Sequence, residues 1–197
     1  MSVFDPKSSA DLLALVRDWP LATLVSNGSD GFAATPLPLL AETDAQGRIV
    51  ALIGHIARRN PQHDALCADG RAVALFHGPQ AYISPRIVSK AKWGATWNYA
   101  FARFQVEVKI TPERTPAAVA MLAEALEGRG EKAWRPEQMG ERYDQLIRHI
   151  VAFRATVLSV DARFKLGQDE DAQTFDEIVK AFEGQPLARM MKEQRPK

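Results

Sequence analysis

The clearest hydrophobic pattern in the chain is a strict alternation of apolar and polar positions near its middle. Phe104, Val106, Val108 and Ile110 are separated by single polar residues. Successive side chains of a β-strand point to opposite faces, so this alternation predicts a half-buried antiparallel strand. We expect that strand to cover residues 95–110.

Shorter apolar runs, each bounded by turn-forming residues, predict the other strands. They cover residues 21–27, 32–40, 51–57, 72–77 and 153–166, with a glycine-rich turn at 27–31 after the first. Pro36 and Pro38 have no N–H to give to a neighbouring strand, so one side of their strand must face something else. The early strands have no helices between them, which argues against a parallel, doubly wound sheet.

Helical periodicity is found near both ends of the chain and in one late segment. A first helix is capped by Ser8 or Ser9 and ends at Pro20, and a short helix follows at residues 62–68. A helical insertion is expected at residues 112–150, and a C-terminal helix at residues 172–183. Residues 190–197 are expected to form a frayed tail.

Particular side chains are assigned to the faces and caps of the late helices. The apolar face of the first helix of the insertion is expected to hold Val119, Leu122 and Leu126, and that of the second Tyr143, Leu146, Ile147 and Ile150. Glu177 completes a possible capping box at Thr174. The elements together predict one domain over residues 1–197, mainly β (α+β), a β-barrel with peripheral helices.

Composition changes the predicted fold little, but it excludes some classes of function. The chain has 197 residues, a net charge of +1 and a single cysteine, Cys67. The near-neutral charge gives no general attraction to nucleic acid or acidic lipid, and one cysteine cannot form an intrachain disulfide. No apolar run approaches the ~20 residues of a membrane helix. We expect a cytoplasmic protein.

Polar residues that could hold a ligand follow two neighbouring predicted strands. Arg58, Arg59 and Asn60 come directly after residues 51–57, and a guanidinium group matches the oxygens of a phosphate. The alternative is a solvated basic loop. Residues 78–85 form a predicted Gly/Pro-rich turn with Tyr82 and Ser84, and residues 96–99 (TWNY) open the next strand. This combination suits a planar, phosphorylated heterocycle.

Other kinds of site are less well supported. The histidines lie far apart in sequence and have no cysteine or carboxylate at metal-ligand spacing, so we expect no metal site. His63 and Cys67 are four residues apart on a predicted helix, but without an orienting third group this pair indicates a packed thiol. The helices of the insertion are separated by residues 128–136, longer than the ~3–4-residue turn of a helix-turn-helix, and direct DNA binding is doubtful.

Several motifs together resemble one family. They are residues 22–25 (ATLV), 35–40 (TPLPLL), 54–62 (GHIARRNPQ), 76–85 (FHGPQAYISP), 96–99 (TWNY) and 165–168 (KLGQ). In this order they are similar to the PaiB-type FMN-binding proteins, usually described as negative transcriptional regulators. The resemblance implies an FMN-binding split β-barrel, related to pyridoxamine-phosphate-oxidase-like flavoproteins. It also implies a homodimer that holds FMN noncovalently at the subunit interface.

The resemblance also implies roles for particular residues. Arg58 and Asn60 would hold the FMN phosphate, and Gln62 would lie nearby. The flavin ring is expected to lie along Thr35, Pro36 and Leu37, with His55 and Ile56 as further contacts. Tyr82, Ser84, Trp97 and Asn98 would line the ring and the ribityl chain, and the partner subunit could supply Trp97 and Asn98. Lys165 and Gln168 would close the site late in the chain.

The sequence departs from the family pattern at the rim of this expected site. Gln80 stands where the family commonly has histidine, residues 86–88 replace a Ser-Trp-Tyr motif, and Gly167 replaces a serine. These changes bear on a substrate or small-molecule effector rather than on FMN. A flavin-dependent oxidoreductase acting on a small molecule is the alternative function, because a bound flavin carries the chemistry itself.

Overall fold

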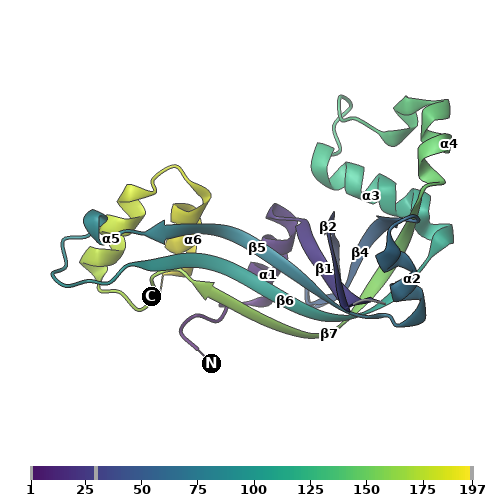
Figure 1. Cartoon of the computed structure of the whole chain (residues 1–197). Coiled ribbons are helices and arrows are strands. Elements are labelled where there is room, and N and C mark those ends of the chain that lie inside the picture. Colours follow the sequence, from purple (N-terminus) through teal and green to yellow (C-terminus); the bar gives the residue numbers. More distant parts are fainter. Residues whose placement is uncertain (1, 29–30, 196–197) are drawn as a thin grey trace.

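The computed structural model describes residues 2–28 and 31–195, which form one antiparallel seven-stranded sheet with helices around it (Figure 1). The strands are β1 (Leu21–Gly28), β2 (Gly31–Pro38), β3 (Leu40–Thr43), β4 (Ile49–Ala57), β5 (Arg71–Ile83), β6 (Thr96–Ile110) and β7 (Ile150–Lys165). The helices are α1 (Ser9–Asp18), α2 (Pro61–Ala68), α3 (Thr115–Glu127), α4 (Glu141–Ile147), α5 (Ala172–Ala181) and α6 (Pro186–Gln194). The predicted fold class, a mainly β split barrel with peripheral helices, is confirmed. Ser29 and Asp30 of the predicted turn at 27–31 lie outside the described residues.

The sheet closes on itself through one extended segment. Its strand order is β2-β1-β5-β6-β7-β4-β3, so β2 and β3 form its two edges. Only Leu39 separates β2 from β3, and its N–H donates to the carbonyl oxygen of Pro20 at 2.9 Å. The same piece of chain therefore borders both edges. Pro36 and Pro38 lie on the edge strand β2, as their missing N–H groups require.

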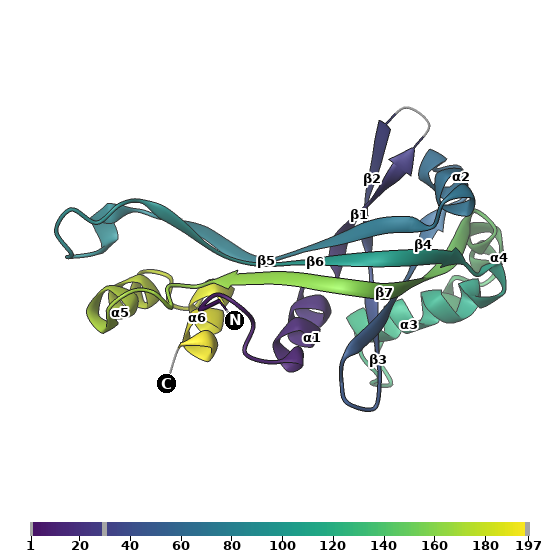
Figure 2. The ribbon, with the colours of Figure 1, turned by 90° about the horizontal axis from the view of Figure 1, so that it is seen from below.

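Three strands extend far beyond the barrel (Figure 2). β5, β6 and β7 have 13, 15 and 16 residues, and they remain paired as far as Ile83 opposite Thr96 and Tyr99 opposite Lys165. We call this extension the arm: the ends of these strands beyond residue 78 in β5, the loop 84–95, and the helices α5 and α6 beside them. Buried side chains run without a break from the barrel into the arm.

The expected turn after residue 77 is wrong, because β5 continues through it to Ile83. The pairing with β6 shifts between His77 and Gln80, so Gly78 and Pro79 occupy a β-bulge. A Cβ atom on Gly78 would lie 2.6 Å from Cδ1 of Leu15 and 3.1 Å from Cβ of Ala100. Glycine is therefore required here for close packing under α1, not for a turn.

The C-terminal segment is also more ordered than predicted. In place of a frayed tail, residues 186–194 form α6, which buries Leu187, Met190 and Met191. The ammonium group of Lys7 donates to the carbonyl oxygens of Glu193 and Arg195, both at 2.8 Å, and satisfies the end of this helix. Residues 196–197 lie outside the described residues.

The capping box predicted at Thr174 is wrong. Asp171 caps α5 instead, because its Oδ1 accepts the backbone N–H of Thr174 at 2.9 Å. The Glu177 side chain accepts hydrogen bonds from Ser89, in a loop far away in sequence.

The helical insertion buries different faces from those predicted. α3 buries Thr115, Ala118 and Ala123, whereas Leu126 is 60% exposed. The Thr115 hydroxyl explains why this face of α3 packs against the sheet. It donates to the carbonyl of Pro112 at 2.7 Å and accepts the Ala152 N–H of β7 at 3.0 Å. α4 has no fully buried residue, and Leu146 on its predicted apolar face is exposed.

Candidate functional site

Two neighbouring guanidinium groups follow the end of β4. The side chains of Arg58 and Arg59 are exposed, and neither has an ion-pair partner within residues 2–28 and 31–195. The backbone N–H of Arg58 donates to the carbonyl of His149 at 2.9 Å, which fixes where its side chain leaves the barrel. Two cations without a protein counter-ion form a local site that favours an anion.

Asn60 connects this site to the barrel. Its Oδ1 accepts the Gln62 N–H at 2.9 Å as the N-cap of α2, and its Nδ2 donates to Oγ1 of Thr35 at 2.9 Å. Its carbonyl accepts the N–H of His63 at 2.8 Å. Pro61 has no N–H, so the first donors of α2 are already bonded to Asn60. The backbone N–H groups at the start of α2 are therefore not free to bind an anion, which must be held by side chains. One amide hydrogen of Asn60 is still free to donate to it.

Gln62 is a buried amide, 1% exposed, that fastens α2 onto β1 and β2. Its Nε2 donates to the carbonyls of Leu24 at 3.1 Å and Ala33 at 3.3 Å and to Oγ of Ser26 at 3.0 Å. Its Oε1 is buried without a partner among the described residues. Ser26, which is itself buried, was missed by the sequence reasoning because its partner is far away along the chain.

A second unpartnered atom lies on β4. The Nδ1 of His55 is buried and has no hydrogen-bond partner in the described part of the chain, and burial lowers the pKa of this side chain. A neutral imidazole can donate or accept one hydrogen bond at such an atom. Unsatisfied buried polar atoms of this kind usually have a water or a ligand as partner.

The remaining barrel residues divide into buried and exposed ones. Leu37 and Ile56 belong to the core, and Leu37 lies opposite Ala22 across the β1–β2 ladder. Of Thr35, Pro36 and Leu37, only Pro36 has an exposed side chain. Contact of this segment with a flat ligand must therefore be made by Pro36 and by the strand edge.

The aromatic residues predicted for the site lie on the arm. Tyr82 of β5 pairs directly with Trp97 of β6, and their rings are 6.0 Å apart in an edge-to-face arrangement. They are 50% and 53% exposed. The Ser84 hydroxyl accepts the N–H of Arg86 at 3.3 Å and starts the turn that follows. Two large aromatic side chains half in solvent form an exposed flat surface.

The other arm residues have mixed roles. Asn98 is buried, and its amide donates to the sulfur of Met191 at 3.6 Å. Gln168 accepts the N–H of Leu166 at 2.7 Å and donates to the carbonyl of Phe164 at 2.6 Å, so its side chain is used internally. The ammonium group of Lys165 contacts Thr96 and the carbonyl of Trp97, beside the aromatic pair.

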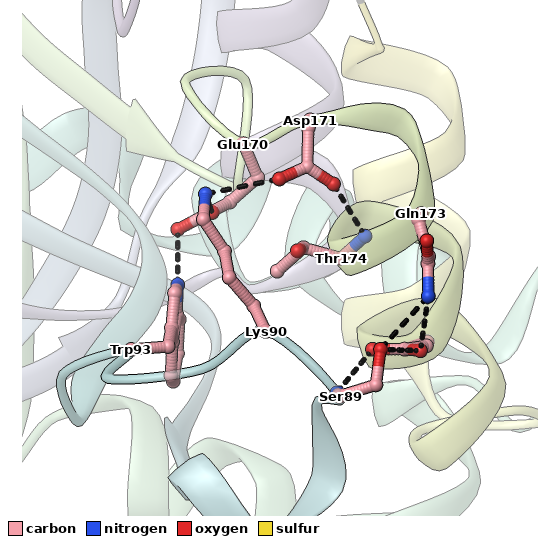
Figure 3. Close-up of polar contacts among 8 residues, drawn as sticks. Ser89, Lys90, Trp93, Glu170, Asp171, Gln173 and Thr174 are labelled. Atoms are coloured by element: carbon pink, nitrogen blue, oxygen red, sulfur yellow. Dashed lines mark hydrogen bonds and ion pairs between the residues drawn. The ribbon is translucent and has the colours of Figure 1, made fainter.

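A network of polar contacts, which the sequence reasoning missed, fastens the tip of the arm to α5 (Figure 3). The indole N–H of Trp93 donates to Oε1 of Glu170 at 2.9 Å, and Lys90 pairs with Asp171 at 2.9 Å. The N–H and hydroxyl of Ser89 bond to Glu177 at 2.7 and 2.6 Å. We call these contacts the arm lock.

The electrostatics of the arm lock favour its charged form. The backbone N–H of Thr174 and the ammonium group of Lys90 lower the pKa of Asp171 to about 2. The Ser89 hydrogen bonds lower the pKa of Glu177, and Asp171 raises that of Lys90. These shifts favour the charged forms of Asp171, Glu177 and Lys90 near neutral pH.

The candidate cofactor residues fall into two groups. The barrel set is Thr35, Pro36, Leu37, His55, Ile56, Arg58, Asn60 and Gln62, and the arm set is Tyr82, Ser84, Trp97, Asn98, Lys165 and Gln168. The structure does not bring Arg58 of the barrel set and the aromatic residues of the arm set together in one protomer. Ile56 of the barrel lies opposite Val151 of β7, whereas Tyr99 of the arm lies opposite Lys165 of the same strand. The intervening residues of β7 span roughly 45 Å at the usual rise of a strand. Figure 2 shows α2 and the arm tip at opposite ends of the molecule. The exposed members of the two sets, among them Pro36, Arg58, Tyr82 and Trp97, face solvent rather than one enclosed pocket.

Two surface hollows lie elsewhere. One, of about 510 Å³, lies between α1, β3 and α3, and another, of about 310 Å³, lies beside Phe32 and Leu158. Neither is lined by Arg58, Asn60 or Trp97. The predicted site residues are therefore recognised by their unpaired charges and orphaned polar atoms, not by a cavity.

Cys67 is exposed, so the prediction of a packed thiol is wrong. In the described part of the chain, no three His, Cys, Asp or Glu side chains gather closely enough to hold a metal ion. Likewise, no helix there is long and apolar enough to cross a membrane.

Comparison with known proteins identifies the family. Residues 1–159 match the model of the family described as "Putative FMN-binding domain", and the chain belongs to this family. The "Protease synthase and sporulation protein PAI 2" of Bacillus subtilis is 22% identical over 194 residues, covering 96% of this chain and 92% of the relative. An uncharacterised protein of Emericella nidulans, AN0679, is 24% identical and covers 87% and 85%. The predicted PaiB-like identity and FMN as cofactor are confirmed.

Solved structures support the same fold. The FAD and heme binding protein from Mycobacterium smegmatis superimposes with a TM-score of 0.63 at 16% identity, covering 89% of this chain and 78% of the other. The conserved hypothetical protein Rv2991 from Mycobacterium tuberculosis gives a TM-score of 0.59 at 17% identity, covering 85% and 91%. At these identities the likeness shows the fold alone.

Proposed function

We propose that the protein works as a homodimer in which FMN lies between the barrel set of one protomer and the arm set of its partner. The observation that carries this proposal is the distance between the end of β4, next to Arg58, and the arm. Near its end β4 pairs with Val151 of β7, and the arm pairs with Lys165, roughly 45 Å further along that strand at its usual rise. One FMN molecule cannot contact both Arg58 and the aromatic pair of the same protomer. A two-fold assembly would place the arm of each subunit against the barrel of the other and form two equivalent sites.

Arg58 is the proposed phosphate ligand in the barrel set. Its guanidinium group lacks an ion-pair partner among the described residues, and its backbone is fixed by His149. Charge-assisted bonds from arginine to phosphate are among the strongest hydrogen bonds in proteins. The remaining amide hydrogen of Asn60 would add a neutral donor beside Arg58.

The arm set supplies the surroundings of the ring. Tyr82 and Trp97 of the partner subunit offer apolar faces that match the flat isoalloxazine, and Lys165 adds a positive charge beside them. On the barrel side, Pro36 and the open edge of β2 would face the same ring. Bound FMN supplies redox chemistry, and the protein residues position it and exclude water.

We infer that any regulatory role acts through a protein partner or a small-molecule effector rather than through DNA contact. α3 and α4 are separated by residues 128–140, and α4 has only seven residues, with Glu141 and Asp144 against one arginine. A recognition helix is normally joined by a tight turn of ~3–4 residues and carries a basic face.

Complementation between two variants tests the shared site. Arg58→Ala and Trp97→Ala homodimers each carry a defect in both of their FMN sites. A mixed dimer has one doubly defective site and one intact site, built from the barrel of the Trp97→Ala chain and the arm of the Arg58→Ala chain. Co-expressed and separately tagged chains should therefore recover parental FMN affinity at half of the sites.

The two parts of the proposal fail in different ways. If purified protein takes up no FMN in a spectroscopic titration, the assigned site is wrong. If the parent binds FMN but the mixed dimer recovers none of the parental affinity, each site lies within a single protomer and the shared arrangement is rejected. A parent that stays monomeric in analytical ultracentrifugation with FMN present also rejects it.

A further inference from the structure

Three polar side chains on the exposed side of α2 form a linked row outside the proposed FMN site. The Cys67 sulfur lies 3.8 Å from Nε2 of His63, and Nδ1 of His63 lies 2.9 Å from Oδ1 of Asp64. The four-residue spacing of His63 and Cys67 places both on one face of the helix. Asp64 is thus the orienting group that the sequence alone did not reveal.

The chemistry of Asp64 determines which nitrogen of His63 carries the proton. An ionised carboxylate can only accept hydrogen bonds, so the Nδ1 that faces it must donate. In the neutral ring Nε2 is then left with a free lone pair, and this is the atom that faces the thiol. The row therefore presents a proton acceptor to the Cys67 sulfur in the correct tautomer.

Access and surroundings are compatible with reaction at this sulfur. Cys67 is exposed, whereas the His63 side chain is only 16% exposed and so is held in place. Cys67 lies in the last turn of α2, where the partial negative charge of the helix end disfavours a thiolate. Activation must therefore come from a side chain, and His63 is the base within reach.

The charged groups near this end of α2 do not supply an alternative. Asp69 and Arg71 follow the helix and pair with each other at 2.6 Å. Glu107 of β6 lies beside Gly70 and interacts with Arg71. Arg71 is thus already paired with Asp69, and none of these groups takes the place of His63.

We propose that Cys67, His63 and Asp64 form a thiol-exchange site that reacts with small aliphatic disulfides. The thiol proton passes to Nε2 of His63, and the Cys67 sulfur attacks one sulfur of the disulfide. The old S–S bond breaks as the new one forms, and the departing sulfur takes the proton from Nε2. One thiol and one disulfide give one mixed disulfide and one thiol, so no other oxidant is needed.

The rate of thiol exchange tests the role of His63. Cys67 is the only cysteine in the chain, so an aromatic disulfide that releases a coloured thiolate reports on this residue alone. His63→Gln should lower the rate constant about tenfold near pH 7, where an ordinary thiol is only a few per cent ionised. Near pH 10 any exposed thiol is largely ionised, so variant and parent should agree within about twofold.

Matched variants separate proton transfer from other effects. His77→Gln makes the same change on β5, away from Cys67, and should leave the rate unchanged. In Asp64→Asn, the carboxylate no longer fixes the proton of His63 on Nδ1, so Nε2 is less often free to accept the thiol proton. The rate should fall about threefold near pH 7. Equal rates for His63→Gln and the parent near pH 7 would overturn the proposal. So would a reduction of the same size at both pH values, because that indicates a change in access only.

Oxidised glutathione tests the class of substrate. Incubation of the full chain should add one glutathionyl group at Cys67, seen by intact-mass spectrometry and removed by a reducing agent. Cys67→Ser should gain no mass. A parent chain that reacts with the aromatic probe but never with glutathione disulfide would reject aliphatic disulfides as substrates and with them the proposed site.

Discussion

The barrel set and the arm set are held in place by different forces. Next to Arg58, two amides fasten α2 to the strands: the buried Gln62 bonds to three groups of β1 and β2, and the half-buried Asn60 bonds to Thr35. Tyr82 and Trp97 instead lie on an arm whose tip is fastened by exposed charged groups. The segment that carries Arg58 is thus anchored in the core, while the proposed ring surface depends on surface electrostatics, which salt and acid can weaken.

The strongest test of this contrast is Gln62→Leu. The apolar side chain fits the space but leaves the carbonyls of Leu24 and Ala33 and the hydroxyl of Ser26 without their donor. We expect the free energy of unfolding to fall by about 3 kcal/mol, measured by urea denaturation. Gln105→Leu, on the exposed face of β6, should change it by less than about 0.5 kcal/mol. Equal midpoints for the two variants would contradict a core role for Gln62.

Removing the proposed phosphate ligand should affect binding rather than folding. Arg58→Ala is expected to weaken FMN binding by about 1.5–3 kcal/mol, the scale of a charge-assisted hydrogen bond. Arg59→Ala is the matched control, and a smaller effect is expected because only Arg58 is assigned to the phosphate. Both are measured by quenching of flavin fluorescence during titration. A larger loss for Arg59→Ala would reverse the assignment.

A smaller loss is expected on the arm. Trp97→Ala should weaken FMN binding by about 1 kcal/mol, because it removes one aromatic face. Its urea midpoint should stay close to that of the parent, since the indole is half exposed. Trp134→Ala, another exposed tryptophan, is the control in the same titration. If the two variants bind FMN equally, Trp97 is not a ring contact.

The smallest expected effect is an acid-induced release of the arm lock. The pKa of Asp171 is lowered to about 2 in the folded protein, below its ordinary value of 3.8. Its contribution is therefore complete above about pH 4 and is lost as the pH falls towards 2. Trp93 emission, taken as the difference between the parent and Trp93→Phe, should change in that range. Asp171→Asn should abolish the change, and a change above pH 5 would assign it to another group.

The sequence predicted the barrel better than the arm, for physical reasons. The alternation from Phe104 to Ile110 reflects a strand with one buried face, and the structure buries that face. β5 was cut short because Gly78 and Pro79 usually mark a turn, whereas here they fill a bulge. α6 was missed because its buried Met190 and Met191 stand among charged residues in a short segment near the end of the chain.

The candidate site shows the same limit. Arg58 and Asn60 could be found from their place after an apolar run, because strand ends are where polar ligand contacts gather. The partners of Gln62 could not be found from the sequence, because Ser26 lies 36 positions away and only the folded barrel brings the two together. The contacts of Ser89 with Glu177, 88 positions apart, were beyond reach for the same reason.

The prolines of β2 also bear on how the protein avoids aggregation. β2 is the edge of the sheet, and an unpaired edge offers a row of donors and acceptors to any passing strand. At Pro36 and Pro38 that row lacks its donors, so a strand from another molecule cannot extend the ladder there. The barrel can therefore expose this edge to a flat ligand without exposing it to fibril-like growth.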